Sequence, residues 1–304
     1  MYSGWYLAAY EREFTDALLG VSIGDVEIML IRGTEGIRAY RSICPHRGAR
    51  LVPAGKLDGN AVICPFHGRR IGLDEPGDDG FCLSSYPTLA VGGLIFVRMS
   101  DAFENGFSDL MQTLDQTYHF VPGFTMRVRT TPEFVIENAF DRRHFKFVHG
   151  LPHVPDLCLE QQQNGAMTVS GSFRLSRANS WQAQSTAAGE DTAMGVTLRV
   201  FSPTLCVTEL SDAAHKYFVI TGATPGGDGE CRVRVSVALA GSPDGSPPDQ
   251  NLVRALLRDS KVSIEQDKAV WEQLVPKAPI GWAPDDDLII EFHKFCAKFR
   301  QSRA

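Results

Sequence analysis

The chain has 304 residues, of which 43% are hydrophobic and 22% are charged, and its formal net charge at pH 7 is −6. This length allows one large or two medium domains, which is more than a lone cluster-binding module needs. The acidic balance and the lack of a long Lys/Arg run exclude nucleic acid as an expected partner. No run approaches the roughly 20 apolar residues of a membrane span, so no membrane association is expected.

The N-terminus and the cysteines indicate a cytoplasmic protein. Residues 1–10 lack a basic region and lead directly into Glu11-Arg12-Glu13, which is not the pattern of a signal peptide. Seven cysteines form an odd number without regular spacing, which favours a reducing compartment over a disulfide framework. Five of them have no ligand-like neighbours and are expected to be buried apolar residues: Cys82, Cys158, Cys206, Cys231 and Cys296.

The first part of the chain predicts an all-β domain. β-rich runs, most of them bounded by Gly, Asp or Pro, occupy residues 26–32, 37–41, 61–64 and 94–98. Residues 101–125 mix acidic residues with Phe, Gly and Pro, which indicates a connector. We therefore expect an all-β domain over residues 1–110 and a second domain over residues 111–304.

The second domain combines helices and strands. A helical pattern runs from residue 132 to 149, and strands are predicted at 167–175, 195–210, 216–223 and 231–239. A turn-rich break ends in a plausible helix cap at Asp249, which precedes a long helix to about residue 275. An amphipathic helix is expected near 285–300. The fold class is therefore α+β.

Two short motifs carry the most specific chemistry. Cys44-Pro-His46 is followed, after seventeen intervening residues, by Cys64-Pro-Phe-His67. Two cysteines and two histidines can bind one zinc ion, but zinc fingers place both cysteines first and both histidines last. Here each loop supplies one of each, as in a Rieske [2Fe–2S] centre, where one iron takes two thiolates and the other takes two imidazoles. Gly48 and Gly68, just beyond the histidines, permit tight loops.

A second constellation lies at Glu137-Asn138-x2-Asp141-x2-His144-x4-His149. Asp141 and His144 are three residues apart and would share a helix face. His144 and His149 are five residues apart, about 140° around a regular helix, so they can bind one metal only if the helix distorts or ends between them. Gly150 supplies such an ending. Non-haem Fe(II) that activates O₂ also needs one carboxylate beside two histidines.

Asp267 is the candidate for that carboxylate. It lies in the long C-terminal helix, on the apolar stripe of Ile264, Trp271 and Leu274. A lone buried carboxylate is costly unless it is paired or bound to a cation. A metal ion would provide that partner, and the alternative is a core aspartate paired with an arginine.

Together these motifs resemble the Rieske non-haem iron oxygenases, specifically the catalytic α subunit. The resemblance covers essentially the whole chain, from Trp5-Tyr6 through both iron motifs to Gln266-Asp267 and Trp271. It implies an N-terminal all-β Rieske domain followed by a helix-grip (START-like) catalytic domain with an antiparallel sheet. By position, it implies that the cluster ligands are Cys44, His46, Cys64 and His67. The implied ligands of a mononuclear iron are His144, His149 and Asp267.

The resemblance also implies an electron route between subunits. Asp141 matches the family's bridging carboxylate, which would link His144 to His67 of a neighbouring subunit in a head-to-tail homotrimer. Asn138 is a candidate to hydrogen-bond near the iron, with a simple polar role in the helix as the alternative. His293 has no partner in the pattern and is given no role. The segments around Trp181 and Phe218 are candidates to reach the substrate cavity.

Two departures favour the monooxygenase and demethylase branch of the family. Arg69-Arg70 follows His67-Gly68 where an aromatic residue is common, and the chain is shorter than the ring-dihydroxylating subunits. The two arginines could present a positive surface to an acidic ferredoxin, or they could be solvated loop residues.

The expected function is an O₂-dependent oxygenase acting on an apolar, aromatic or natural-product-like small molecule. NAD(P)H electrons would arrive through a flavin reductase, a ferredoxin or both, because this chain has no Gly-x-Gly-x-x-Gly fingerprint. One alternative is cis-dihydroxylation of an aromatic ring. The alternative from another class is a non-catalytic Rieske electron carrier or redox sensor, in which His144 and His149 are only structural.

Overall fold

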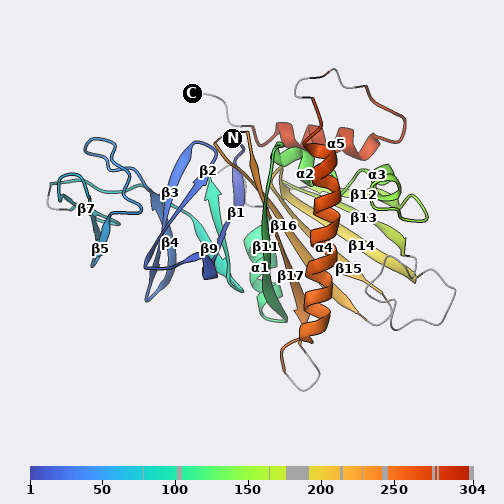
Figure 1. Cartoon of the computed structure of the whole chain (residues 1–304), viewed down its shortest axis with the longest axis horizontal. Helices are drawn as coiled ribbons and strands as arrows, with labels where there is room; N and C mark the ends of the chain where they lie inside the picture. Colours follow the sequence, from blue (N-terminus) through green and yellow to red (C-terminus); the bar gives the residue numbers. More distant parts are fainter. Residues whose placement is uncertain are drawn as a thin grey trace.

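The computed structural model describes residues 1–77, 79–100, 105–163, 165–175, 192–212, 215–227, 229–241, 246–275, 278 and 281–300. The N-terminal strands form a smaller unit beside a large sheet that one long helix crosses (Figure 1). Among these residues, no helix is both long and apolar enough to cross a membrane. Trp181 lies outside the described residues.

The N-terminal unit is built from three small antiparallel sheets. Their strand orders are β1-β10-β9, β2-β3-β4-β8 and β5-β6-β7. The strands are β1 (Gly4–Tyr10), β2 (Leu18–Ile23), β3 (Val26–Gly33), β4 (Gly36–Arg41), β5 (Lys56–Asp58), β6 (Ala61–Ile63), β7 (Arg70–Gly72), β8 (Ser85–Tyr86), β9 (Thr88–Val91) and β10 (Leu94–Met99). The prediction of an all-β N-terminal part is therefore confirmed.

The C-terminal unit is a seven-stranded antiparallel sheet in the order β11-β17-β16-β15-β14-β13-β12. Its strands are β11 (Tyr118–Val128), β12 (Asp156–Gln163), β13 (Ala166–Leu175), β14 (Thr192–Ser202), β15 (Leu205–Ser211), β16 (Lys216–Pro225) and β17 (Cys231–Ala240). The helices are α1 (Phe107–Asp115), α2 (Pro132–Glu137), α3 (Arg142–Phe147), α4 (Gln250–Trp271) and α5 (Asp287–Ala297). The sheet carries α4 across one face, which is the expected helix-grip arrangement (Figure 1).

The sequence of α4 explains both its start and its orientation. The Asp249 side chain accepts a hydrogen bond from the Asn251 N–H at 2.9 Å, which caps the first turn as predicted. Apolar residues at helical spacing bury the two ends of the helix, at Val253 and Leu256 and again at Trp271. Between these ends the same face carries small polar residues, so α4 leaves a cavity open between itself and the sheet.

Three details of the predicted fold were wrong. Residues 101–125 are not a connector, since they include α1 and the start of β11. The Pro122-Gly123 pair that suggested a loop lies at a bulge of β11, an edge strand, where proline is tolerated. The single strand predicted at 195–210 is two strands joined by a turn, and the helical segment 132–149 is two short helices.

The two units share a continuous apolar core. Leu7 of β1 and Phe96 of β10 pack in one buried cluster with Phe107 of α1 and Leu205 of β15. The backbones also approach closely at Gly222 of β16, where an added Cβ would lie 2.5 Å from the Leu7 Cβ. The Rieske-like unit is thus fixed to the sheet by packing rather than tethered by a linker.

This close approach predicts the cost of enlarging Gly222. Replacing it by valine should lower the free energy of unfolding by about 1–3 kcal/mol, because a well-packed core must shift to admit the side chain. Gly227, which has no atom within 4 Å of an added Cβ, provides the matched control as Gly227→Ala. Denaturant unfolding of both variants measures the difference, and equal stabilities would contradict the tight contact.

Candidate metal centres

The two Cys-His loops have the same backbone geometry. In the loop after β4, the Gly48 N–H donates to the Cys44 carbonyl at 3.0 Å, and the Cys44 N–H donates to the Ala49 carbonyl at 2.8 Å. The loop after β6 repeats this pattern from Gly68 and Cys64 at 3.0 and 2.8 Å. Both glycines are left-handed, with φ of 74° and 66°. The expectation that these glycines permit tight loops is therefore confirmed.

The loops bring the four expected cluster ligands together. Cys44 and Cys64 are buried, and the rings of His46 and His67 lie 5.0 Å apart between centroids. Burial raises the pKa of the Cys44 thiol and the neighbouring Cys64 raises it further, although backbone N–H groups of His46 and Arg47 hydrogen-bond to its sulfur. These amides are placed where they would hydrogen-bond to the sulfur of a cluster ligand.

Two further observations test whether a [2Fe–2S] cluster suits these residues. The His46 Nδ1 is buried and has no hydrogen-bond partner, as expected of an imidazole nitrogen reserved for a metal. The Cys44 and Cys64 thiols hydrogen-bond to each other, and the His46 and His67 rings contact each other, so the donors form one sulfur pair and one imidazole pair. A Rieske cluster takes its ligands in such pairs, with two thiolates on one iron and two imidazoles on the other. The donor set fits two irons better than one zinc.

The second site is a compact triad of metal-ligand side chains. The donor atoms of His144, His149 and Asp267 lie within 4.8 Å of one another. His144 lies in α3, His149 follows its end, and Asp267 lies on the buried face of α4. The chain turns after α3, where Val148 N–H donates to the His144 carbonyl at 2.7 Å and Gly150 has a φ of 67°. The helix thus ends between the two histidines, as the sequence required.

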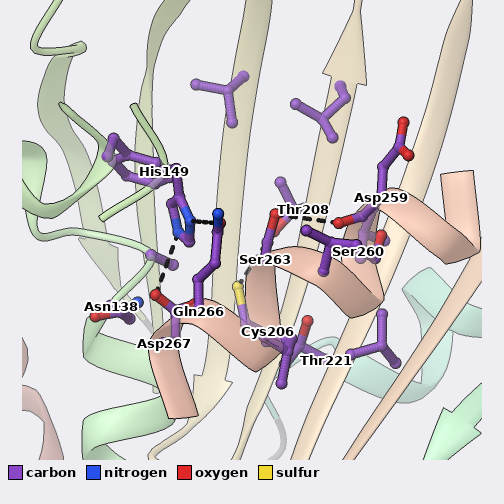
Figure 2. A pocket seen from close by; sticks show the side chains of 18 of the residues that line it. Asn138, His149, Cys206, Thr208, Thr221, Asp259, Ser260, Ser263, Gln266 and Asp267 are labelled. Carbon is purple, nitrogen blue, oxygen red and sulfur yellow. Dashed lines mark hydrogen bonds and ion pairs between the residues drawn. The ribbon is translucent and has the colours of Figure 1, made fainter. Parts of the chain in front are cut away.

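In both histidines a hydrogen bond occupies Nδ1 and leaves Nε2 available to bind a metal. The His144 Nδ1–H donates to the Asp141 carbonyl at 2.6 Å, which leaves Nε2 as the donor atom for a metal. The His149 Nδ1–H donates to the Gln266 Oε1 at 2.9 Å, and its Nε2 lies 3.2 Å from the Asp267 Oδ1 (Figure 2). Two Nε2 atoms and one carboxylate are the donor set of a non-haem iron site, so the residues fit that metal.

Burial and the nearby carboxylate act in opposite directions on the pKa values of the two triad histidines. Burial lowers the pKa of His144, and this outweighs the hydrogen bond to Asp141 and the charge of Asp267. Burial also lowers the pKa of His149, but the hydrogen bond and charge of Asp267, with help from Gln266, leave that pKa raised. Asp267 is 5% exposed, and its ion-pair partner is His149 rather than an arginine. A divalent cation would take the place of the shared proton.

Gln266 was not assigned a role from the sequence, and its contact predicts one. Gln266→Leu should weaken Fe(II) binding by about 10- to 100-fold, because the hydrogen bond that orients the His149 ring and fixes its tautomer is lost. Titration of iron-free protein with Fe(II) measures the affinity. The neighbouring exposed Glu265, which pairs with Lys261 at 3.8 Å, provides the control as Glu265→Gln. Equal affinities in both variants would contradict this role.

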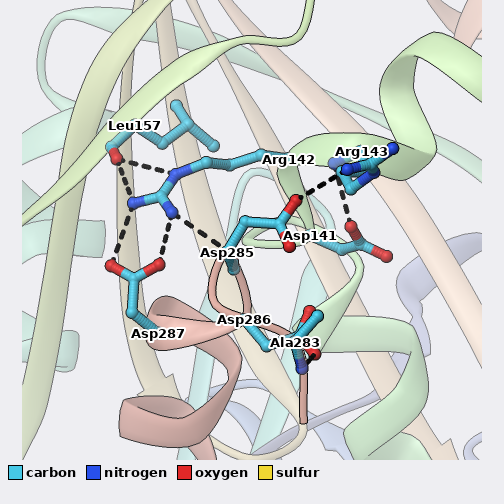
Figure 3. A network of polar contacts seen from close by, with 8 residues as sticks. All are labelled: Asp141, Arg142, Arg143, Leu157, Ala283, Asp285, Asp286 and Asp287. Atoms are coloured by element: carbon cyan, nitrogen blue, oxygen red, sulfur yellow. Dashed lines mark hydrogen bonds and ion pairs between the residues drawn. The ribbon is translucent and has the colours of Figure 1, made fainter.

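Asp141 caps α3 rather than lying within a helix. Its Oδ1 accepts hydrogen bonds from the N–H groups of Arg143 and His144, at 3.0 and 3.2 Å. The sequence expectation of a shared helix face was therefore wrong, although Asp141 does lie beside His144. The following arginines fasten α3 to the C-terminal region (Figure 3). Arg142 donates to the Leu157 carbonyl and to both carboxylate oxygens of Asp287, and Arg143 pairs with Asp285.

A cavity of about 590 Å³ extends from the triad along α4. His149, Gln266 and Asp267 lie at one end, and Asp259 and Ser260 lie at the other (Figure 2). Asp259 and Asp267 are eight positions apart, which corresponds to about 12 Å along a helix. The walls are mostly apolar side chains of the sheet and α4, among them Phe173, Leu198, Val219 and Leu256. This volume is typical of sites that enclose a small organic molecule.

A smaller cavity of about 200 Å³ adjoins the triad at His144 and Asp267. It shares Asn138, His144 and Asp267 with the large cavity, and it adds Glu137 and Asp141. Asn138 therefore lies beside the triad, and its hydrogen bond near the iron stays a prediction.

Several sequence expectations about other residues need correction. Cys158 is exposed and Cys82 is half-buried, so only three of the five remaining cysteines are buried. Arg69 and Arg70 are paired with Asp79 and Asp58, at 2.6 and 3.0 Å, which weakens the case for a free positive surface. Leu274 is exposed and lies beyond the end of α4. His293, which had no assigned role, hydrogen-bonds to Glu137 at 2.9 Å.

Two protein-family models match the chain in sequence order. Residues 4–80 match the Rieske [2Fe-2S] domain, and residues 98–297 match the 3-ketosteroid 9alpha-hydroxylase C-terminal domain. The first match contains all four cluster-ligand candidates, and the second contains the triad.

Similar sequences are oxygenase components. The chain is 30% identical over 158 residues to the vanillate O-demethylase oxygenase subunit of Pseudomonas sp. strain HR199, a match covering 48% of this chain and 44% of that protein. It is 22% identical over 305 residues to the probable 3-ketosteroid-9-alpha-monooxygenase oxygenase component of Rhodococcus rhodochrous. This match covers 88% of this chain and 72% of that protein. The match thus spans less than half of the length of the vanillate relative.

Solved structures share the fold over nearly the full chain. Dicamba monooxygenase bound to dicamba aligns with a TM-score of 0.73 at 17% identity, covering 97% of this chain and 96% of that chain. NdmA of Pseudomonas putida CBB5 with caffeine aligns with a TM-score of 0.70 at 19% identity, covering 96% and 89%.

Proposed function

This chain belongs to the Rieske non-haem iron oxygenases, and on that premise we propose that it is an O₂-dependent monooxygenase or demethylase component. The observation that carries the proposal is the buried triad of His144, His149 and Asp267 at the end of a largely apolar cavity. Iron held by this triad, with electrons from a Rieske cluster on Cys44, His46, Cys64 and His67, would activate O₂ beside the substrate.

The chain's own residues define what the site can accept. The mostly apolar walls would bind an apolar or aromatic body and exclude water from it, and the cavity of about 590 Å³ has room for more than one ring. Polar side chains of α4 and the sheet, including Thr208, Ser260 and Ser263, could orient a polar group away from the triad. A non-catalytic electron carrier would need no such cavity beside a metal triad, so the catalytic alternative is favoured.

We further propose that electrons pass between subunits of a homotrimer. The cluster loops lie next to β5 and β7 at one end of the molecule, and α3 and α4 lie toward the other end (Figure 1). Exposed apolar side chains occur at both ends, with Phe66 59% exposed beside His67 and Phe147 69% exposed in α3. A head-to-tail contact would cover both and bring His67 toward Asp141 of the neighbouring chain.

The electron donor is proposed to be a separate flavin reductase, with or without a ferredoxin, that is supplied by NAD(P)H. The proposed compartment is the cytoplasm, because all seven cysteines are free thiols.

Metal analysis and oxygen labelling test the function. The purified protein should hold about three irons and two acid-labile sulfides per chain, whereas a carrier would hold about two of each. With a reductase, NAD(P)H and ¹⁸O₂, an apolar substrate should gain one labelled oxygen or lose a methyl group. A cis-diol with two labelled oxygens would replace this proposal with ring dihydroxylation, and two irons without turnover would contradict catalysis.

A further inference from the structure

The small cavity beside the triad connects it to a half-buried ion pair. Glu137 lines this cavity together with Asn138, Asp141 and His144. The Glu137 Oε2 lies 2.9 Å from the His293 Nε2 of α5, and the Glu137 side chain is only 14% exposed. The His293 side chain is 35% exposed, so it reaches solvent. Solvent, His293, Glu137 and the cavity therefore follow one another in space.

The small cavity can hold a few waters. Its volume of about 200 Å³ has room for about six, counting roughly 30 Å³ for each. Half of its lining residues are apolar, and the others, among them Glu137, Asn138, Asp141 and Asp267, supply polar partners for such waters. The larger, mostly apolar cavity adjoins it at Asn138, His144 and Asp267, so waters in the small cavity would lie beside the substrate cavity.

The proposed monooxygenation needs protons from outside the site. One O₂, one substrate C–H bond, two electrons and two protons give one alcohol and one water. The O–O and C–H bonds break, a C–O bond and the alcohol O–H form, and the two protons complete the water. The electrons come from the reduced donor protein through the cluster. Apolar walls cannot deliver protons, so a polar path to solvent is required.

We propose that His293 and Glu137 form a proton relay into the mononuclear site through the small cavity. His293 takes a proton from solvent at Nδ1 and donates one from Nε2 to the Glu137 carboxylate. Glu137 then releases a proton to water beside Asn138 and His144, and His293 protonates Glu137 again. This inference rests on the proposed function, and it assigns a role to Glu137 and His293 that the metal-binding motif does not require.

The charged groups around His293 favour its protonated form. The hydrogen bond that His293 donates to Glu137 raises the pKa of His293, against the effect of burial, and the charge of Glu137 adds to the rise. Glu133, also in α2, acts in the same direction, and Arg300, beyond the end of α5, opposes it. The uncharged Trp282 ring packs edge-on against His293 at 5.4 Å between centroids. His293 should therefore carry a proton over more of the neutral pH range than a free histidine.

Variants that keep the hydrogen bonds but remove proton transfer test the relay. Glu137→Gln keeps an acceptor for His293 and removes the titrating carboxyl group. Product formation should fall at least about 10-fold, the solvent deuterium isotope effect on a single turnover should rise, and reduced oxygen should leave as peroxide. His293→Gln should act in the same direction. Glu133→Gln is the matched control, since Glu133 lies in the same helix, bonds to Tyr2 and lines neither cavity.

Two measurements do not depend on turnover. In the iron-free protein, NMR titration should show a raised pKa for His293 that falls in Glu137→Gln and stays raised in Glu133→Gln. Iron and sulfide content and the melting temperature should match the wild type in all three variants. A crystal structure should show ordered waters in the small cavity between Glu137 and His144.

The outcomes separate the relay from a structural role and from the proposed function. Wild-type turnover with an unchanged isotope effect in Glu137→Gln would overturn the relay. Loss of iron or of stability in that variant, or an equal loss of activity in Glu133→Gln, would also overturn it in favour of a structural ion pair. A wild-type protein that oxidises no substrate would instead contradict the proposed function itself.

Discussion

Replacing Asp267 by alanine is expected to reduce the iron content from about three to about two per chain and to abolish product formation. Asp267 supplies the only carboxylate of the buried triad among the described residues, and its Oδ1 lies 3.2 Å from the His149 Nε2. Removing it leaves two imidazoles, which should lower Fe(II) affinity by more than the roughly 100-fold that loss of an outer partner costs. The Rieske absorption spectrum should be unchanged, because the cluster ligands lie in the other unit.

Iron analysis and visible absorption measure both sites in the same sample. Glu265→Gln is the matched control, because Glu265 is two residues from Asp267 but is exposed and lines neither cavity. It should hold about three irons and turn over normally. A variant Asp267→Ala that retains three irons and activity would remove Asp267 from the proposed ligand set.

The proposed ligand residues could be identified from the sequence because their signals are local. Each cluster loop is one contiguous stretch, in which Cys64 and His67 are held by a turn that Gly68 closes. Asp267 required one step more, since a charged residue on a buried helix stripe needs a partner, and the structure shows that partner to be His149. Helix periodicity and the cost of burying charge were sufficient for that inference.

Contacts between distant parts of the chain could not be predicted in this way. Glu137 and His293 are separated by 156 residues, and nothing in the spacing of either residue identifies the other. The Arg142–Asp287 pair and the cavity walls from β14 to β16 depend on the same tertiary arrangement. Even local patterns fail where tertiary structure overrides them, as at the β11 bulge, where Pro122 and Gly123 suggest a loop.

Asp141→Asn is expected to leave both metal sites filled and α3 intact while product formation falls at least about 100-fold, the upper end of what an outer partner of a metal site costs. The structure indicates that this substitution should keep the helix cap. Asp141 caps α3 through bonds from Arg143 and His144, and asparagine is an equally good cap. Asp141→Ala should in addition lose about 1 kcal/mol of stability with the cap. Melting temperature and iron content separate the two effects, and wild-type turnover in Asp141→Asn would remove the bridging role.

Mixing two inactive variants tests whether the bridge acts between subunits. Cys44→Ser chains should lack the cluster but keep Asp141, whereas Asp141→Asn chains should keep the cluster. If electrons pass from the cluster of one chain to the triad of its neighbour, co-assembled mixtures should regain activity that neither variant has alone. Activity should return because the cluster of an Asp141→Asn chain can serve an intact site next to it. A mixture of confirmed hetero-oligomers that stays inactive would place the transfer within one chain, and a monomeric protein would contradict the trimer.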